Sequence, residues 1–382
     1  MKKDDATWVQ ETVQKLVTKT KAESLRVGDN IPYFPHDGHY IDAARIMPDG
    51  VSWWTNGFWP GLMWLMFNAT QDERYLLAAR KTQVRLSQAL QVFTKLNHDV
   101  GFMYLLSSGA DYKLTGDADA RRQALHAAAL LAGRFNPVGR FIRAWDEAGW
   151  LQADPRGCMI IDSMMNLSLL YWASEETGDP RFSQIAESHA DTALRTILRA
   201  DGSCYHVAEF DPATGEFLRG YGGQGYDDIS AWSRGQSWAL YGFALSAKHT
   251  GRRDFLDAAK RSAHYCIASL SASDWLPLVD FRAPAEPIKY DSGAGAIIAA
   301  GLLEIAAQVT ELEQPLYRDA ALRILRALDA RFCDWNIDTD GIVSGGTTMY
   351  HSDKLANMPF IYNDFFFAEA VLRLDGKCLE LW

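Results

Sequence analysis

The stretch DSMMNLSLLYWASEETGDPRFSQIAESHA (162–190) joins two helices of different character through one short turn. Its first half is apolar or small on nearly every side, which indicates a helix packed all round. Its second half repeats apolar residues at helical spacing with polar residues between them, which indicates one buried face. Gly178 accepts the left-handed conformation past a helix end, and Pro180 opens the next helix. The stretch therefore predicts a helical hairpin.

The same hairpin signal recurs along the chain. Related turns begin at Ala69, Leu114, His249 and Leu312. An amphipathic segment, the first at about 6–22, precedes each of six apolar segments, which begin near Asn56, Asp99, Asp162, Ser233, Asp291 and Asp364. Six inner and six outer helices predict an all-α fold, an (α/α)6 barrel or six-hairpin toroid, with one catalytic domain spanning 1–382.

Composition narrows the function classes. The chain has 382 residues and a formal net charge of −10, which argues against nucleic acid or an anionic membrane as a partner. A small anionic substrate stays possible, because a few local cations can dominate one pocket. The N-terminus has no apolar core of signal-peptide length, and no stretch reaches the uninterrupted apolar length of a membrane span. Five widely spaced cysteines without a CxxC pair favour a reduced, cytoplasmic protein without a zinc site.

A buried carboxylate is the first functional clue. Asp162 interrupts an apolar run, and stripping water from a carboxylate costs several kcal/mol or more. Each inner segment begins with Asp, Asn or Ser, and the barrel would bring those ends to one mouth. Helix capping explains such residues one at a time. Alternatively, a funnel ringed by helix N-termini attracts anions and holds carboxylates in place.

Aromatic residues favour a ligand-binding funnel over helix capping. Tryptophans cluster in VSWWTNGFW and RAWDEAGW, while LNHDVGF and YGGQGYDDISAWSRGQSW add polar groups. Flat rings beside carboxylates are typical of sugar-binding clefts, although they also fill cores. Two carboxylates are the usual acid–base pair of glycoside cleavage. We predict Asp99 and Asp162 for these roles; Asp227, Asp228, Asp291 and Asp364 are held in reserve, and the sequence leaves open which acid is protonated.

Several long motifs carry a resemblance to a known family. The stretches NHDVGF, IIDSMMNLSLLYWASEETGDP, YHVAEFDPATGE, AWSRGQSWALYGFAL and YHSDK together resemble the unsaturated glucuronyl hydrolases of glycoside hydrolase family 88. That family has an (α/α)6 barrel, in agreement with the helix count. The resemblance implies removal of the Δ4,5-unsaturated uronic acid from lyase-generated glycosaminoglycan oligosaccharides, such as unsaturated chondroitin or hyaluronan disaccharides. The double bond is protonated at C4 and takes water at C5, with no metal, cofactor or covalent intermediate.

The resemblance also implies roles for single residues. Asp162 matches the acid/base carboxylate and Asp99 the second essential aspartate, which contacts ring hydroxyls. Substrate-binding positions are matched by Trp54, His98, Trp145, His206, Gln224, Arg234, Trp238, Tyr350, Ser352 and Lys354. The plainer alternatives are ordinary buried histidines at 98 and 206 and a surface charge at 234.

The chain departs from the family pattern at three positions. Gly223 stands where some members have histidine, and Asn56 replaces an aspartate. In members that prefer a 6-sulfated sugar, two serines and a lysine hold the sulfate. Ser352 and Lys354 match the second serine and the lysine, whereas Met349 replaces the first serine, with Thr348 as a neighbouring substitute. We expect a 6-sulfate to be accepted.

Three alternatives remain open at this point. An unsaturated rhamnogalacturonyl hydrolase shares the barrel and the chemistry. A sugar 2-epimerase uses the same barrel but prefers paired histidines, and a non-catalytic glycan-binding barrel needs no proton donor. We expect a small anionic oligosaccharide as the partner of a monomer or weak homo-oligomer.

Overall fold

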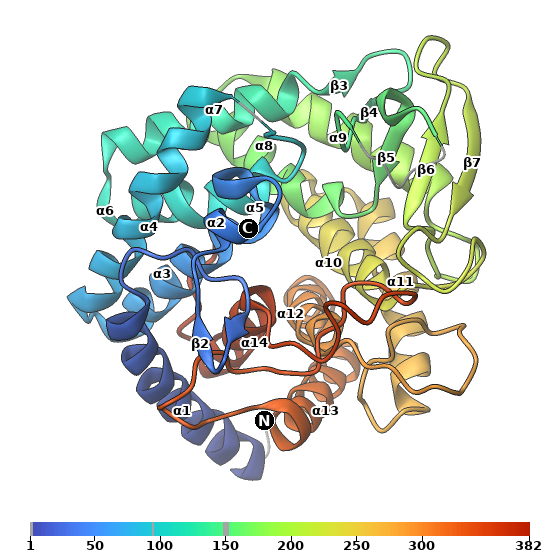
Figure 1. Ribbon diagram of the computed structural model, residues 1–382. Helices are drawn as coiled ribbons and strands as arrows, with labels where there is room; N and C mark the ends of the chain where they lie inside the picture. The colour runs from blue at the N-terminus through green and yellow to red at the C-terminus, as the bar shows by residue number, and fades with distance from the viewer. Residues whose placement is uncertain (1–2, 94, 148–152) are drawn as a thin grey trace.

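The computed structural model describes residues 3–93, 95–147 and 153–382, and its helices form a double ring (Figure 1). The outer ring consists of α1 (Lys3–Val27), α4 (Glu73–Val92), α7 (Ala118–Ala132), α9 (Pro180–Thr196), α11 (Arg253–Ser271) and α13 (Gln314–Phe332). The inner ring consists of α3 (Phe58–Thr70), the segment α5 (Val100–Tyr104) to α6 (Ala110–Thr115), α8 (Ser163–Thr177), α10 (Ser233–Thr250), α12 (Ser292–Gln308) and α14 (Ile361–Asp375). Helix α14 packs on α3 and closes the ring. The predicted (α/α)6 barrel is confirmed.

Burial separates the two rings as the sequence patterns predict. Every residue of α12 from Ser292 to Ala306 is buried, because both neighbouring inner helices and the outer α13 cover it. Helix α9 instead buries one face, which includes Phe182, Ala186 and His189. An all-apolar helix needs neighbours on every side, and an amphipathic helix needs one. This difference fixes which helices lie inside.

The inner helices begin differently from the predicted positions at two places. Helix α3 starts at Phe58, after a short 3-10 turn, η2 (Trp54–Gly57). Helix α14 starts at Ile361, so Asp364 lies one turn inside the helix and not at its end. The second inner helix contains a π-helical turn, η3 (Leu105–Gly109), between α5 and α6.

The long loops fold into small antiparallel sheets, which the helix pattern did not predict. Strands β1 (Pro35–His36) and β2 (His39–Tyr40) form one hairpin, and β3 (Phe135–Asn136) and β4 (Phe141–Ile142) form another. A three-stranded sheet has the order β5 (Cys158–Ile160), β6 (Val207–Phe210) and β7 (Phe217–Tyr221). This last sheet ties the segment before α8 to the loop before α10. The remaining short elements are α2 (Ala43–Ile46), η1 (Gly50–Ser52) and η4 (Pro155–Gly157).

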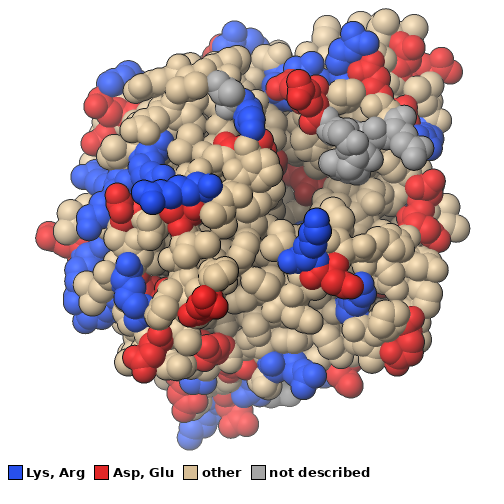
Figure 2. Space-filling view, in the orientation of Figure 1, with Lys and Arg blue, Asp and Glu red and all other residues tan. Residues whose placement is uncertain are grey.

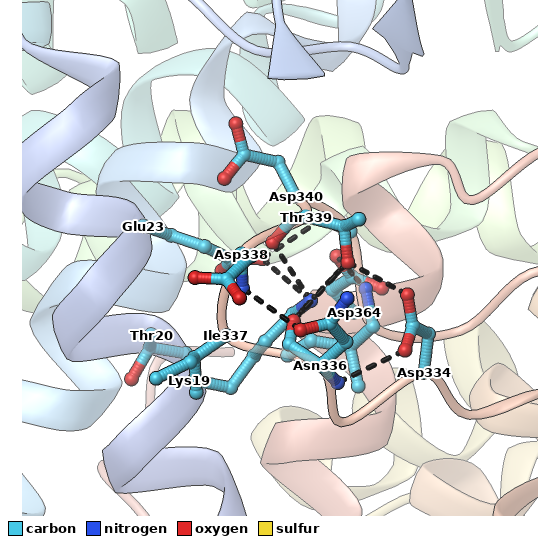
Figure 3. A network of polar contacts seen from close by, with 12 residues as sticks. Lys19, Thr20, Glu23, Asp334, Asn336, Ile337, Asp338, Thr339, Asp340 and Asp364 are labelled. Carbon is cyan, nitrogen blue, oxygen red and sulfur yellow. Dashed lines mark hydrogen bonds and ion pairs between the residues drawn. The ribbon is translucent and has the colours of Figure 1, made fainter. Parts of the chain in front are cut away.

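A buried polar network joins the first helix to the last part of the chain. Figure 3 shows Lys19 of α1 reaching into the loop between α13 and α14. Its Nζ donates to the carbonyl oxygens of Asn336 at 2.5 Å and Thr339 at 2.9 Å, and it lies 4.0 Å from Glu23. Asp364 accepts the backbone N–H groups of the same loop at Ile342 and Val343, 3.0 and 2.7 Å away. The network therefore links the first helix and the last helix of the chain through the loop between α13 and α14.

The C-terminal segment packs inside the ring. The Trp382 indole stacks on Phe366 with ring centroids 6.0 Å apart, and it also contacts Phe102 and Tyr241. Among the helices of the described chain, we find none with both the length and the apolar character of a membrane-spanning segment.

Candidate active site

A cavity of about 420 Å³ opens at the N-terminal ends of the inner helices. Figure 2 shows a hollow in this face with acidic side chains inside it. Six of the predicted site residues line the cavity: Trp54, Asp99, Trp145, Asp162, Gln224 and Arg234. They come from segments far apart in the sequence, and the convergence of the inner helix ends brings them together.

A second cavity of about 330 Å³ lies at the opposite end of the inner helices. Its buried cation, Arg373, is paired with Glu304 at 3.1 Å and Glu369 at 3.3 Å. Glu380 lies 3.2 Å from the same guanidinium, so three carboxylates face this one cation and the cavity offers little for an anionic ligand. The chemistry is concentrated at the first cavity.

Asp99 and Asp162 lie at the first turns of the neighbouring inner helices α5 and α8. Outer helices α4, α7 and α9 are capped by the side chains of Asp72, Asp117 and Asp179. By contrast, neither Asp99 nor Asp162 makes a side-chain cap bond within the part of the chain that the structure describes. The capping explanation is therefore wrong for these two residues.

His206 is the direct neighbour of Asp162. The His206 Nε2 atom lies 3.3 Å from Asp162 Oδ1, and its Nδ1 accepts the Gln224 backbone N–H at 3.1 Å. Because an N–H group can only donate, Nδ1 carries no proton and Nε2 presents its proton to the carboxylate. Gly223 makes this arrangement possible: its φ is +55°, and a Cβ there would lie 2.2 Å from His206 Nδ1.

The surroundings of Asp162 favour its ionised form. Burial alone would raise the pKa of Asp162, but the adjacent His206 ring, whose hydrogen bond is the largest opposing cause, holds the pKa below its ordinary value. A donor aimed at a carboxylate stabilises the charge. His206 therefore acts on the site and is more than an ordinary buried histidine.

The pKa of Asp99 is shifted in the opposite direction to that of Asp162. Burial, assisted by the charge of Asp162, raises the pKa of Asp99 to about 8, so this carboxyl is protonated at neutral pH. His98 Nε2 lies 3.4 Å from Asp99 Oδ2, and His98 Nδ1 is 2.8 Å from Ser163 Oγ. Burial lowers the pKa of His98 to about 3, which keeps the ring neutral. The cavity thus holds one neutral and one ionised carboxyl group, a division typical of acid–base catalysis.

Arg234 supplies buried positive charge at the cavity wall. Its Nη1 donates to Asp291 Oδ2 at 2.8 Å, and its Nη2 donates to the Thr348 carbonyl at 2.6 Å. Burial opposes the charge of Arg234, but Asp291 keeps its pKa above the ordinary value. The side chain is 3% exposed, so the alternative of a surface charge is wrong.

Two predicted aromatic residues lie away from the cavity lining. Trp238 is fully buried and packs on Phe102 and Phe366, because its position on α10 points into the centre of the inner ring. Tyr350 packs edge-on against Tyr226, with ring centroids 5.0 Å apart. Trp238 lies behind Phe102, which also contacts Trp54, and Tyr350 belongs to one hydrophobic cluster with the cavity-lining Trp232.

The late loop contributes its middle residues to the cavity. Thr348, Met349 and Leu355 line it, whereas Ser352 and Lys354 lie on the outward part of the same loop. Thr348 Oγ1 donates to the Leu355 carbonyl at 3.4 Å. This hydroxyl is therefore engaged in holding the loop, which weakens its case as a substitute for the missing serine.

The four reserve carboxylates are not part of the cavity lining. Asp291 pairs with Arg234, Asp364 belongs to the network between the chain ends, and Asp227 and Asp228 are exposed on the loop before α10. Asn56 is buried, and its Nδ2 donates to the carbonyls of Gly50 and Val51, so it has a structural position.

Several cavity residues were not assigned to the site from the sequence, although the aromatic-rich stretches singled out there contain Trp53 and Trp232. Tyr33, Asp49, Trp53, Asn97, Glu147 and Trp232 line the cavity, mostly from loops without helical periodicity. Asn166 contacts Asp99 from the next helix, and its spacing of one helical turn from Asp162 was the available signal. In residues 3–93, 95–147 and 153–382, no group of three or more His, Cys, Asp or Glu side chains is placed to hold a metal ion.

Comparisons with known proteins agree with this geometry. Residues 32–372 match the model of Glycosyl Hydrolase Family 88. The unsaturated glucuronyl hydrolase of Bacillus sp. (strain GL1) is 37% identical over 366 residues, which are 94% of each chain. A crystal structure of unsaturated glucuronyl hydrolase from Bacillus sp. GL1 gives a TM-score of 0.89 at 35% identity. The superposition covers 96% of this chain and 97% of that one.

Two streptococcal relatives extend the comparison. The unsaturated chondroitin disaccharide hydrolase of Streptococcus pneumoniae (strain ATCC BAA-255 / R6) is 33% identical over 358 residues, 90% of this chain and 88% of that one. A mutant unsaturated glucuronyl hydrolase from Streptococcus agalactiae, solved with dGlcA-GalNAc6S, gives a TM-score of 0.83 at 26% identity and covers 99% and 94% of the two chains. Because the family model matches most of the chain and these relatives are similar over nearly their whole length, the chain belongs to glycosyl hydrolase family 88.

Proposed function

We propose that this chain removes the Δ4,5-unsaturated uronic acid from the non-reducing end of lyase-generated glycosaminoglycan oligosaccharides by hydrating the vinyl-ether double bond. The observation that carries the proposal is the pair of carboxyl groups, Asp99 neutral and Asp162 ionised, in one cavity with aromatic rings. Relatives named for unsaturated glucuronyl and chondroitin disaccharide substrates support it.

The pair holds the one proton that the reaction needs. Hydration adds a proton to C4 and takes a proton back from water, so a site with one neutral and one ionised carboxyl is prepared for both transfers. In the free enzyme that proton resides on Asp99. Substrate binding would bring sugar hydroxyls to Asp99, which favours its ionised form, and would desolvate Asp162 beside an anion, which favours its neutral form. The proton then lies on Asp162, the predicted acid.

The steps follow from that protonation state. Asp162 gives its proton to C4, and the C5 cation that develops is shared with the ring oxygen. Water bonds to C5 and gives up a proton to Asp162. This restores the protonation state of the substrate complex, in which Asp162 is neutral and Asp99 is ionised. The resulting hemiketal opens and releases the next sugar. Arg234 and the Gln224 amide stand at the same wall and are suited to a uronate carboxylate, with Arg234 the stronger partner.

Ultraviolet absorbance of the conjugated enoate tests the proposal directly. Wild type should abolish the absorbance of unsaturated chondroitin disaccharides, whereas Asp162→Asn and Asp99→Asn should lower kcat by at least about 100-fold. Release of the second sugar should keep pace with the loss of absorbance. Release of the second sugar with the enoate absorbance intact would refute hydration, and an unchanged rate in Asp162→Asn would remove that residue from the acid role. If wild type is inactive, the unsaturated rhamnogalacturonan disaccharide is the next substrate.

Acceptance of a 6-sulfate is the finer part of the proposal. Lys354 is exposed on the loop that lines the cavity, and the Lys354 backbone N–H donates to Ser352 Oγ at 3.4 Å. A cation here would favour a sulfated second sugar. We expect Lys354→Ala to lower the ratio of kcat/KM for 6-sulfated over unsulfated disaccharide by about 2- to 5-fold, the contribution of one exposed ion pair. An unchanged ratio would contradict this assignment, and Lys289, which is held by Asp353 at 2.9 Å, would be the next cation to replace.

The cellular location and the oligomeric state of the enzyme are also part of the proposal. All five cysteines are unpaired, which supports a cytoplasmic location. We further propose that residues 1–382 act as one catalytic domain in a monomer or weak homo-oligomer.

A further inference from the structure

Asn166 connects the two carboxylate-bearing helix ends. It lies one turn after Asp162 on α8 and is 1% exposed. Its Oδ1 accepts the Phe102 backbone N–H of α5 at 2.7 Å. Its Nδ2 lies 3.4 Å from Asp99 Oδ1 and 3.3 Å from the Asp162 carbonyl. One side chain therefore contacts the start of both helices.

The orientation of this amide is set by its partners. The Phe102 N–H can only donate, so the oxygen of the Asn166 amide must face it. The NH₂ group consequently faces Asp99. A hydrogen bond of 3.4 Å is long, but bonds in substrate-free sites often tighten when substrate binds. Asn166 is therefore a built-in donor to the neutral carboxyl of the pair.

Glycine at position 101 allows the two helices to approach this closely. A Cβ on Gly101 would lie 2.5 Å from Asn166 Oδ1 and 2.6 Å from the Asn166 Cα. The start of α5 thus rests directly on α8, and the Asn166 amide fixes the contact. His98 Nε2 lies 3.4 Å from the other Asp99 oxygen, so each carboxyl oxygen has a polar neighbour.

We propose that Asn166 is a positioning residue, which fixes Asp99 relative to Asp162 and stabilises the charge that Asp99 gains when it gives up its proton. This inference rests on the proposed function, because it assigns Asn166 a part in that reaction. A donor to a carboxylate lowers its pKa, so loss of the donor should raise the pKa of Asp99.

The first test is the pH dependence of kcat/KM, which reports groups of the free enzyme. In Asn166→Ala the alkaline limb, which belongs to Asp99, should move to higher pH. At neutral pH kcat should fall about 10- to 100-fold with a smaller change in KM, since misplacement by about 1 Å can cost that much. Asn166→Asp keeps the acceptor for the Phe102 N–H, should lose some stability because it buries a further carboxyl, and should show the same displaced limb.

Asn363 offers a matched control. It is a buried asparagine at the start of inner helix α14, where its Nδ2 donates to the Val343 carbonyl at 3.0 Å and a Cβ on Gly293 would lie 2.3 Å from its Oδ1. Asn363→Ala should lose thermal stability comparably but keep the alkaline limb of wild type. If both Asn166 variants keep that limb and lose only as much rate as Asn363→Ala, the proposal is overturned.

A second readout separates this proposal from the proposed function. Carbon-13 NMR of aspartate carboxyls, with Asp99→Asn to assign the signal, measures the titration of Asp99 without substrate. A higher Asp99 pKa in Asn166→Ala supports the donor role, and an unchanged one overturns it. Inactivity of wild type toward every unsaturated disaccharide would instead refute the function while leaving this titration decisive.

Discussion

Removing the Lys19 ammonium should destabilise the barrel far more than removing its acidic neighbour. Lys19 is fully buried, and its Nζ donates hydrogen bonds to the carbonyl oxygens of Asn336 and Thr339. The carboxyl groups of Glu23 and Asp364 lie beside it. Lys19→Met fills the same space but leaves two carbonyls without their donor and the Asp364 carboxylate without its cation. Loss of one partner from a buried ion pair costs about 3–5 kcal/mol. We expect that loss in the free energy of unfolding at pH 7.5.

Glu23→Gln should be nearly neutral. Glu23 Oε1 accepts the Gly341 N–H at 2.8 Å, and among the described residues Oε2 has no hydrogen-bond partner. Burial, followed by the charge of Asp364, raises the pKa of Glu23 well above its ordinary value, so a neutral amide resembles the group already present. We expect a change within about 1 kcal/mol, both in the wild-type background and in Lys19→Met.

The pH dependence gives the sharper test. Burial raises the pKa of Asp364 to about 6, and Lys19 opposes that rise. A raised pKa in the folded state means that the stability contribution is fully present below the ordinary value of 3.8 and is lost as pH rises through about 6. Without Lys19 the folded-state pKa rises further. The penalty of Lys19→Met should therefore be smaller at pH 5, about 1–3 kcal/mol for the unpaired carbonyls, than at pH 7.5.

Equilibrium urea unfolding, followed by tryptophan fluorescence, measures these differences. Lys15→Met is the matched control, because Lys15 lies on the same helix with its side chain 43% exposed, 3.9 Å from Asp329; an exposed pair is worth about 1 kcal/mol or less. The reasoning is refuted if Lys19→Met costs no more than Lys15→Met, or if its penalty is the same at pH 5 and pH 7.5.

Two further predictions concern the residues around Asp162. His206→Ala removes the N–H that keeps Asp162 ionised, so its pKa should rise and the acid limb of kcat/KM should move to higher pH; an unmoved limb would show that His206 does not set the charge. Gly223→Ala should lower kcat/KM about 10- to 100-fold, because its Cβ would displace His206. Gly178→Ala is its control: φ is +70° with open space around the site, so it should cost about 1 kcal/mol of stability and leave the kinetics unchanged.

The repeated hairpins made the fold predictable, because one buried face and all-round burial leave different marks in a sequence. The carboxylates were also predictable: Asp162 is conspicuous in its apolar run, and Asp99 occupies the matching helix start. The two tryptophans of AWSRGQSW show the limit. Trp232 precedes α10 and lines the cavity, whereas Trp238 lies within that helix and joins the core. Only the position at which the helix begins separates them.

Loop residues were beyond prediction for a related reason. Tyr33, Asp49 and Trp53 reach the cavity from irregular segments, where neither a period of 3.6 nor a period of 2 reveals the direction of a side chain. Their places depend on contacts with distant parts of the chain, which one sequence does not display.

The π-helical turn in the second inner helix bears on how Asp99 comes to face Asp162. Such a turn, here η3 (Leu105–Gly109), accommodates one residue more than a regular helix of the same rise. If the same residues wound as a regular helix, everything before the turn would lie about 100° further round the helix axis. Asp99 would then point away from Asp162 while the apolar packing beyond the turn stayed in register. The wider turn thus lets Asp99 face the mouth of the barrel while α6 keeps its packing.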